Sequence, residues 1–431
     1  MKKLWSKSKK EILHSAVLKY TVGTDSMFDI RLMPFDIRAS IAHAKGLLKI
    51  GILNKDEETK ITSTLGALLK GVHKGEIKIT PADEDCHTVI ENYLVERLGD
   101  AGKKIHTGRS RNDQVLVAVR LYMKDNLKNL QIGCVKLAGT FLDIAVRYEN
   151  VPMPGYSHTQ QAMLSSLGHY FSAFAESLLD DADFLALTLK NLDKSPLGSA
   201  AGFGVSIPLD RDFTAKELGF ADVQVNSLYC QNSRGKFEST YMETLAQVML
   251  TLGKFANDIL LFTSQEFDFF EVDDSLVTGS SIMPHKKNLD VMEILRGNVS
   301  VIIANQLVVK DIAKNLISGY NRDVQLIKKP LFESTQIVLD SLEVVGLVLK
   351  GLTPKEKNIG AKINNAIFTA DIANDLVLKN GVPFRDAYNQ ALGIAAEKTP
   401  NLVKNIMSKM SLGAPGNLGL KKLRERLKKQ K

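Results

Sequence analysis

Long stretches of the sequence carry apolar residues at every third or fourth position, and this spacing limits the fold more than any other feature. In residues 240–264, the recurring apolar side chains are Tyr241, Leu245, Val248, Met249, Leu252, Phe255, Ile259 and Leu260. The spacing places them on one face of an α-helix. Residues 164–185, a segment starting near residue 290 and residues 338–349 follow the same pattern. We therefore predict an all-α protein built around an elongated bundle of long helices.

Strand-like alternation is rare, and the candidate strands are short segments at residues 77–80 and 205–207. The Gly- and Lys-rich residues 99–108 and the break at residues 351–357 interrupt the helical pattern. These breaks predict three parts: an N-terminal helical domain at 1–108, a central long-helix bundle domain at 109–354 and a small C-terminal helical domain at 355–431.

Composition limits the class of protein. Of the 431 residues, 44% are hydrophobic, which is enough for a sizeable core. Three cysteines, without a CxxC pair or ligand-like histidine spacing, favour a reducing compartment with neither disulfides nor a zinc site. The basic start, residues 1–10, is not followed by a signal-peptide-like apolar stretch, and no run of roughly 18 apolar residues occurs. We expect a cytoplasmic protein without a membrane span.

The formal net charge is +8, and its densest basic run is residues 421–431. That run has no interleaved aromatic residues to stack on bases, so a solvated helical tail explains it better than a nucleic-acid interface. A basic protein also attracts polycarboxylate substrates. We therefore expect a small-molecule ligand rather than nucleic acid.

Two polar clusters offer groups that bind a ligand with several carboxylates. Residues 104–114, KIHTGRSRNDQ, combine guanidinium, hydroxyl and amide groups. The groups belong to Arg109, Ser110, Arg111 and Asn112. A solvated turn with local Arg–Asp pairing explains this cluster about as well. In residues 319–328, a turn leading into a helix can aim three side chains at one ligand, although this signal is weak. They are Tyr320, Gln325 and Lys328.

Residues 154–160, PGYSHTQ, precede a long apolar-periodic stretch, and we expect them to open its helix. Within them, His158 is flanked by hydroxyl and amide side chains, and the ordinary histidine pKa near 6.5 suits proton transfer at neutral pH. A lone histidine is more often structural. His158 is therefore a candidate that needs a second observation.

Residues 278–290 form a polar loop with Gly279 as a hinge before Ser280. A serine on a mobile loop reaches a substrate only when the loop closes, and Lys286 together with backbone amides can favour its alkoxide. Glu293 follows in the first turn of the next helix, where it can orient a histidine. The alternative is an ordinary helix-capping loop with Asn288 as the cap.

These segments, taken in order, resemble the aspartase/fumarase superfamily, whose shared motif has the form GSSxMPxKxNP. GSSIMPHKKNLD at residues 279–290 is similar to it. HTGRSRNDQ, the EDxH segment at 84–87, PGYxHxQ and YNxDxQ resemble the argininosuccinate lyase branch in particular. The resemblance runs from about residue 25 to residue 332.

The resemblance implies an all-α fold with three domains and a homotetramer in which central helices of four subunits form one bundle. Each active site then draws on three subunits, so polar clusters on separate helix ends meet between chains. The implied reaction belongs to arginine biosynthesis. It is the reversible anti elimination of fumarate from argininosuccinate, which gives L-arginine through a carbanion and needs no metal or organic cofactor.

The resemblance also implies roles by position. Ser280 matches the general base, and Lys286 matches the cation that stabilises the dianionic intermediate. His158, held by Glu293, matches the pair on the leaving-group side. The matching substrate-binding positions are Arg109, Ser110, Arg111, Asn112, Ser157, Asn288, Tyr320, Gln325 and Lys328. Ser157 stands where the family usually has threonine.

The sequence departs from the family pattern around the site. His285 replaces a glutamine, and Leu289 replaces a proline that stiffens the loop. The other changed positions are Met163, Leu164, Gly235, Lys236, Leu326 and Ile327. At the family's ligand-binding serine stands Asp25, with Ser26 one residue away, so that role is open. A lyase of the same superfamily acting on an acylated argininosuccinate or on adenylosuccinate, and a catalytically silent crystallin-like homologue, are the alternatives.

Overall fold

The computed structural model describes residues 14–80, 83–397 and 400–430, so the basic start at residues 1–10 lies outside the described residues. The described chain forms two compact units. Unit 1 combines residues up to 129 with 185–245 and 302–336, and unit 2 combines 130–184, 246–301 and 337 onward. The three consecutive domains expected from the sequence stay a prediction.

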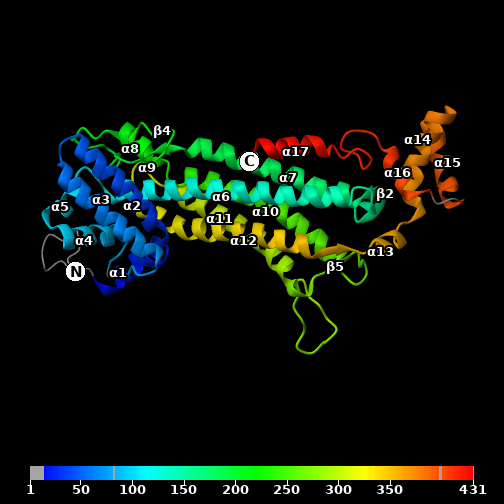
Figure 1. Cartoon of the computed structure of the whole chain (residues 1–431), viewed down its shortest axis with the longest axis horizontal. Helices are drawn as coiled ribbons and strands as arrows, with labels where there is room; N and C mark the ends of the chain where they lie inside the picture. The colour runs from blue at the N-terminus through cyan, green and yellow to red at the C-terminus, as the bar shows by residue number, and fades with distance from the viewer. Residues whose placement is uncertain (1–13, 81–82, 398–399, 431) are drawn as a thin grey trace. The chain divides into compact units, whose positions relative to one another are not determined.

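Unit 1 contains a group of helices that precede the first long helix (Figure 1). They are α1 (Ser15–Val22), α2 (Asp25–Lys49), α3 (Lys55–His73), α4 (Cys86–Leu98) and α5 (Asp100–Lys103), followed by the 3₁₀ helix η1 (Lys104–His106). The later elements of unit 1 are β3 (Lys194–Ser195), α8 (Arg211–Glu217), β4 (Asp222–Val223), α9 (Ser227–Asn232) and the 3₁₀ helix η3 (Arg322–Ile327). The strands β3 and β4 form a short parallel pair.

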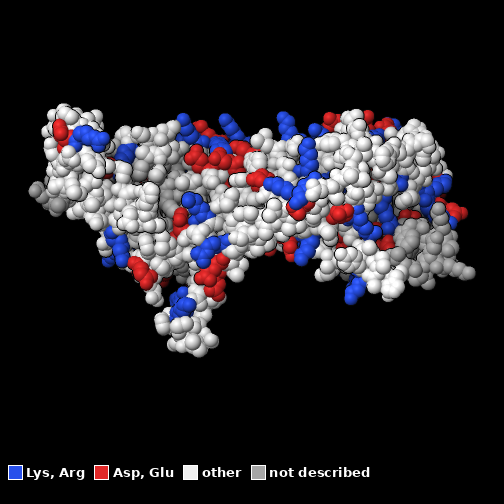
Figure 2. Space-filling view, turned by 180° about the vertical axis from the view of Figure 1, so that it is seen from behind, with Lys and Arg blue, Asp and Glu red and all other residues white. Residues whose placement is uncertain are grey.

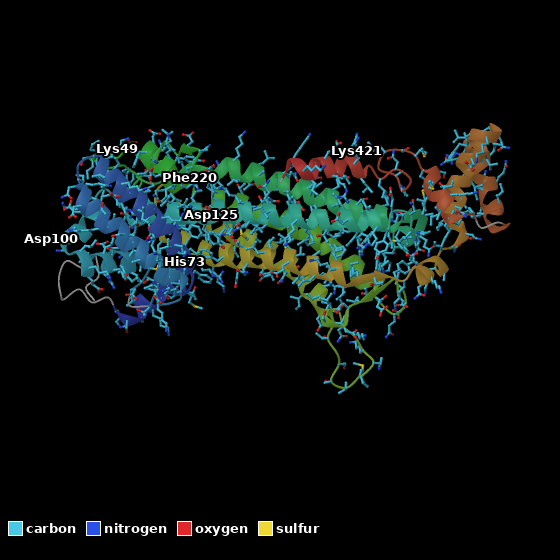
Figure 3. The ribbon with its side chains drawn as sticks, viewed as in Figure 1. Lys49, His73, Asp100, Asp125, Phe220 and Lys421 are labelled. Atoms are coloured by element: carbon cyan, nitrogen blue, oxygen red, sulfur yellow. The ribbon has the colours of Figure 1, made fainter. Side chains whose placement is uncertain are left out.

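Caps and buried contacts fix these helices. Asn54 and Glu57 form a reciprocal capping box at the start of α3. α2 packs against α3 and α4, and its last residue, Lys49, pairs with Asp210 at 2.7 Å (Figure 3). In the core of the unit, the Tyr122 and Phe332 rings pack edge to face with centroids 4.4 Å apart.

Unit 2 contains a β-hairpin of β1 (Pro152–Ser157) and β2 (Gln160–Ser166), and β5 (Phe270–Val272) pairs with β6 (Leu352–Pro354). After β6 follow short helices at the C-terminal end of the chain. They are α13 (Glu356–Ala361), η4 (Asn365–Phe368), α14 (Thr369–Asn380), α15 (Phe384–Glu397), α16 (Leu402–Ser408) and α17 (Leu420–Lys429). A 3₁₀ helix, η2 (Asp274–Leu276), precedes the polar loop.

The basic C-terminal run is helical, as expected, but one of its faces is packed. In α17, Leu423 and Leu427 are buried, and Arg426 pairs with Asp180 at 2.6 Å. Arg424 pairs with Asp143 at 3.0 Å. The helix is therefore attached to unit 2 along one side, and part of its positive charge is neutralised.

Five long helices confirm the all-α prediction, and each contributes residues to both units. They are α6 (Arg111–Arg147), α7 (Leu167–Leu192), α10 (Lys236–Phe262), α11 (Asp290–Ala313) and α12 (Lys328–Gly351). By length and composition alone, three helical stretches could cross a membrane: 111–147, 227–262 and 290–313. The expected absence of a membrane span therefore stays a prediction.

Three local predictions were wrong. Residues 77–80 and 205–207 are not strands; Ile77 and Ile79 are half-buried while Lys78 is exposed, so the alternation reflects one-sided packing without a partner strand. Residues 154–160 do not open a helix. Instead, His158 and Thr159, with φ of 51° and 59°, make the tight turn of the β1–β2 hairpin, and α7 starts at Leu167.

Candidate active site

Unit 1 contains a polar cleft of about 220 Å³ that brings together two of the predicted clusters. Five of the predicted substrate-binding residues line it: Arg111, Asn112, Tyr320, Gln325 and Lys328. The remaining lining residues are Val22, Asp25, Glu84, Asp85, His87, Val115, Arg234 and Arg322. Side chains more than 200 residues apart in the sequence thus face one cavity.

The loop before α6 owes its shape to Asp113, a fully buried residue in the first turn of that helix. Its Oδ1 accepts a hydrogen bond from the Ser110 backbone N–H at 2.9 Å, and its Oδ2 accepts from Gly198 and Ala200 at 3.0 and 3.1 Å. The Ser110 hydroxyl accepts from the Asn112 N–H at 3.2 Å. Ser110 therefore shapes the loop and is not among the residues that line the cleft.

Arg109 lies beneath the cleft rather than on its surface. Its side chain is 2% exposed, and its guanidinium donates to Ser40 Oγ at 2.8 Å and to Asp36 Oδ1 at 3.3 Å. The other oxygen of Asp36 bonds His87 Nδ1 at 2.6 Å. Burial alone would lower the pKa of His87, but Asp36 outweighs it and raises that pKa. Arg109 and Asp36 together hold His87 at the cleft.

Arg111 reaches the acidic side of the cleft from the start of α6. Its Nη1 lies 3.3 Å from Glu84 Oε2 and 3.2 Å from Asp85 Oδ2, and its Nη2 donates to Thr88 Oγ1 at 2.9 Å. Glu84 adopts a φ of 69°, which is uncommon for a residue other than glycine and is frequent at functional sites.

Lys328 is almost fully buried at the base of the cleft and has two carboxylate partners on α2. Its Nζ lies 2.8 Å from Asp25 Oδ2 and 2.6 Å from Asp29 Oδ1. Burial opposes the charged form of the lysine, yet the two aspartates raise its pKa above the ordinary value. Burial also raises the pKa of Asp25 to about 6, against the opposing effect of Lys328.

One buried group near the cleft has the chemistry of a metal site. The side chains of Asp36, Cys86 and His87 place possible ligand atoms within 4.8 Å of one another. The Asp36–His87 hydrogen bond already uses two of those atoms, and burial raises the pKa of the Cys86 thiol, which disfavours the thiolate that binds metals. We therefore interpret the group as an internal hydrogen-bond network.

The polar loop of unit 2 spans residues 278–290 between η2 and α11 and projects from its neighbours (Figure 1). Backbone hydrogen bonds of 2.9 and 2.8 Å between Thr278 and Asn288 close its base. Ser280 Oγ accepts hydrogen bonds from the backbone N–H groups of Met283 at 3.1 Å and Ile282 at 3.4 Å. The loop amides therefore already point at the predicted base.

The remainder of the loop makes few contacts. Lys286 is exposed and Ile282 is 83% exposed. On the face seen in Figure 2, the end of the projection shows no Lys, Arg, Asp or Glu. Asn288 donates from its side chain to the Gly279 carbonyl at 3.3 Å. Leu289, the residue at the family's proline position, is buried and anchors the base of the loop.

The leaving-group residues also lie in unit 2. Ser157 ends β1, and His158 is exposed in the hairpin turn. Glu293 is exposed in the first turn of α11, as predicted. Among the described residues of one chain, no hydrogen bond joins His158 to Glu293, so the expected pairing stays a prediction.

Sequence reasoning assigned no role to several cleft residues. In the sequence, Asp25 stands out only as a departure from the family pattern, and Arg234 only as the residue that precedes the changed positions Gly235 and Lys236. Glu84, Asp85 and His87 belong to the EDxH segment, which signals the family but does not by itself reveal that they face Arg111. The hydrogen-bonding partners that define these roles lie up to 303 residues away in the sequence.

Comparison with known proteins places the chain in a class and then in a family. Residues 17–304 match the protein family described as lyase, so the chain is an enzyme of this class. Two solved structures have similar folds. EDDS lyase in complex with formate matches with a TM-score of 0.79 and 21% identity, and the match covers 96% of this chain and 90% of that chain. A fumarate lyase:delta crystallin from Brucella melitensis bound to cobalt matches with a TM-score of 0.73 and 20% identity, and the match covers 94% of this chain and 92% of that chain. Their low identity supports the fold alone.

Curated relatives give the family. The argininosuccinate lyase of Thermotoga neapolitana is 42% identical over 90% of this chain and 96% of its own length. The argininosuccinate lyase of Sorangium cellulosum is 42% identical over 99% of this chain and 98% of its own length. The argininosuccinate lyase of Xanthomonas campestris is 39% identical over 98% of this chain and 98% of its own length. The chain belongs to the argininosuccinate lyase family.

Proposed function

We propose that the chain catalyses the reversible elimination of fumarate from argininosuccinate to give L-arginine, as part of arginine biosynthesis. The observation that carries this proposal is the unit 1 cleft, where residues from the 104–114 and 319–328 clusters converge in a chain about 40% identical to argininosuccinate lyases. The roles below are parts of the same proposal.

Ser280 acts as the base in the first step. Its oxygen takes a proton from the carbon next to the one that carries the leaving nitrogen, and the electron pair stays on the carbon as a carbanion delocalised into the adjacent carboxylate. The N–H groups of Ile282 and Met283 favour the serine alkoxide, and Lys286 stabilises the dianionic intermediate once the loop closes.

The second step breaks the carbon–nitrogen bond. The electron pair of the carbanion forms the double bond of fumarate, the bond pair leaves with the guanidino nitrogen, and that nitrogen accepts a proton. His158 donates it from the opposite face of the substrate, oriented by Glu293. No step requires a metal or an organic cofactor.

The cleft residues bind the substrate with different functions. Five of the proposed substrate-binding residues line the cleft: Arg111, Asn112, Tyr320, Gln325 and Lys328. Two others belong to unit 2, where Ser157 directly precedes His158 and Asn288 lies in the same loop as Ser280. Arg109 and Ser110, by their buried contacts, position the loop and His87 rather than contact the substrate.

We also propose that the working molecule is a homotetramer whose active sites combine residues of different subunits. The support is α11, in which Ile294, Val301 and Val308 recur at seven-residue spacing and are 66%, 41% and 44% exposed. Such a stripe favours burial against another copy of the chain. Light scattering should give about four times the 47.5 kDa of one chain, and Val301→Lys should lower that mass.

We further propose that this enzyme is cytoplasmic and binds no nucleic acid or membrane. All three cysteines are buried without disulfide partners, which fits a reducing compartment. The apolar stretches of α6, α10 and α11 are explained by bundle packing in the tetramer. Sedimentation with lipid vesicles and with DNA, both expected to be negative, tests this point.

The alternatives are an acylated argininosuccinate or adenylosuccinate as substrate and a silent crystallin-like protein. Fumarate release, followed by its ultraviolet absorbance, is expected with argininosuccinate and not with adenylosuccinate. The reverse preference would assign the chain to another reaction, and no release from any of the three substrates would favour the silent protein.

A further inference from the structure

Two charged residues of the unit 1 cleft, Asp25 and Arg234, have bonding capacity that the described part of the chain does not use. Asp25 bonds Lys328 through Oδ2, and no hydrogen bond to its Oδ1 is formed among the described residues. Arg234 is 8% exposed, and its Nη1 is buried without a hydrogen-bond partner among those residues. Buried polar atoms are normally satisfied, and Arg234 is one of the residues that line the cleft, so its unpaired guanidinium nitrogen indicates an acceptor supplied by a ligand.

The base of the cleft near Asp25 is suited to a cation. Lys328 carries one positive charge, but Asp25 and Asp29 surround it with two negative charges, so the three residues together carry a net charge of about −1. Lys328 therefore has little charge left for a substrate carboxylate. A ligand ammonium group beside Asp25 would complete the neutralisation and donate a hydrogen bond to the free carboxylate oxygen.

Arg234 supplies the opposite charge from a rigid position. The next residue, Gly235, has a φ of 84°, and a Cβ there would lie 2.4 Å from Ala313 Cβ, so any other residue would displace the backbone. The Gly235 N–H donates to Glu238 at 2.7 Å. The Arg234 guanidinium lies 5.4 Å from the centre of the Tyr320 ring. Two contacts thus fix the direction of the guanidinium.

We propose that Asp25 and Arg234 determine the specificity of the cleft by recognising both charges of an α-amino acid head group. Asp25 binds the α-ammonium group and Arg234 binds the α-carboxylate group of the arginine half of the substrate. This inference rests on the proposed function for the identity of the substrate. It predicts that the cleft rejects an α-N-acylated substrate, because acylation removes the positive charge and leaves Asp25 unpaired.

Binding of the product tests the inference separately from catalysis. Calorimetry compares arginine with Nα-acetylarginine, which lacks the ammonium charge, and with agmatine, which lacks the carboxylate. The full-length protein is expected to bind arginine about 10- to 100-fold more tightly than either analogue, the range for a charged hydrogen bond. Equal affinity for all three would overturn the inference even if the enzyme releases fumarate from argininosuccinate.

Two variants separate the two charges. Asp25→Asn should abolish the preference for arginine over Nα-acetylarginine and keep the preference over agmatine, while Arg234→Gln should do the reverse. Asp25→Ser, which keeps a small polar group, replaces Asp25→Asn if that variant does not fold. The crossed pattern is a result that a general loss of structure would not give.

The matched control is Asp125→Asn, the same substitution at a carboxylate of unit 1 that pairs with Arg38 and does not line the cleft. It should leave both preferences unchanged. If Asp125→Asn changes the preferences as Asp25→Asn does, or if each of the two cleft variants lowers both preferences equally, direct recognition is contradicted. A protein that shows the crossed pattern but releases no fumarate would keep this inference and reject the proposed reaction.

Discussion

The unit 1 cleft, where we propose that the substrate binds, is built from buried and paired side chains, whereas the 278–290 loop of unit 2, which holds the proposed base, is exposed. In the cleft, Lys328 is 7% exposed in its side chain and held by two carboxylates, and Arg111 has three partners. In the loop, Lys286 is exposed and Ile282 is 83% exposed. We therefore infer that the proposed recognition site is organised before the ligand arrives, whereas the proposed base, Ser280, needs a closing motion of its loop.

This difference predicts that substitutions in the two regions affect different quantities. A change in the loop should lower the rate of the reaction with little effect on folding, because few native contacts are lost. A change in the buried cleft network should lower stability or affinity, because it leaves a charge unpaired.

Ser280→Ala should have the largest effect. Removing the base should lower kcat for fumarate release by at least about 10²- to 10⁴-fold, the usual contribution of a positioned acid or base. Arginine affinity and the unfolding midpoint should stay unchanged, since among the described residues Ser280 bonds only backbone groups of its own loop. Ser281→Ala, one residue further along the exposed loop, is the control; equal rates for Ser280→Ala and the parent would remove the base assignment.

Asp29→Asn should be the most damaging change to stability in the cleft. It removes one of the two carboxylate partners of the buried Lys328, and the loss of this charge-assisted hydrogen bond should cost about 1.5 to 3 kcal/mol of unfolding free energy. Denaturant unfolding followed by circular dichroism measures it. A loss below about 0.5 kcal/mol, the size typical of exposed pairs, would mean that the network is not preorganised.

Arginine affinity should depend on pH through Asp25. Burial raises the pKa of Asp25 to about 6. The positive charge of Lys328 opposes this rise, whereas the negative charges of Asp29 and Asp85 add to it. Arg234 is a further charged residue that lines the same cleft. As the pH falls from 7 to 5, the carboxylate is protonated, and binding of the α-ammonium group should weaken about tenfold.

The direction of this effect separates it from acid unfolding. The pKa of Asp25 in the folded protein lies above the unfolded value, so ionisation of this residue destabilises the fold as the pH rises from about 4 to 6. At low pH the effect of Asp25 on the free energy of unfolding is therefore favourable. A loss of arginine affinity at low pH does not follow from it. Asp25→Asn should give a flatter affinity profile. A profile with the same midpoint in the variant would assign the titration to another group.

Lys287→Gln should give the smallest effect. Lys287 pairs with Asp274 at the exposed base of the loop, and this pair is open to solvent. The unfolding midpoint of the variant should equal that of the parent within error. A clear decrease in the midpoint would show that the loop is held more firmly than its exposure indicates, and the contrast between the regions would weaken.

The long helices were predictable because their signal is local. Apolar spacing predicted the helix at 240–264, and α10 spans Lys236–Phe262. The β1–β2 hairpin was missed because the segment lacks the Asn-Gly or Asp-Gly pair that usually marks such a turn, and His158 and Thr159 adopt positive φ instead. The tertiary pairing of β1 with β2 decided the structure there.

The candidate site was predictable where a motif is continuous in the sequence. Arg111, Asn112 and Ser280 lie in such motifs, and the cleft or loop contains them where expected. The burial of Arg109 was not predictable, because it depends on Asp36 and Ser40 of α2, about 70 residues earlier. The role of Asp25 likewise depends on Lys328, which is distant in sequence.

The measurement that tests the central claim most directly is fumarate release by the purified full-length protein from argininosuccinate and, in parallel, from adenylosuccinate. We expect a continuous rise in ultraviolet absorbance with argininosuccinate, near loss of that rise in Ser280→Ala, and no rise with adenylosuccinate. No fumarate from argininosuccinate with a folded protein that binds arginine would contradict it.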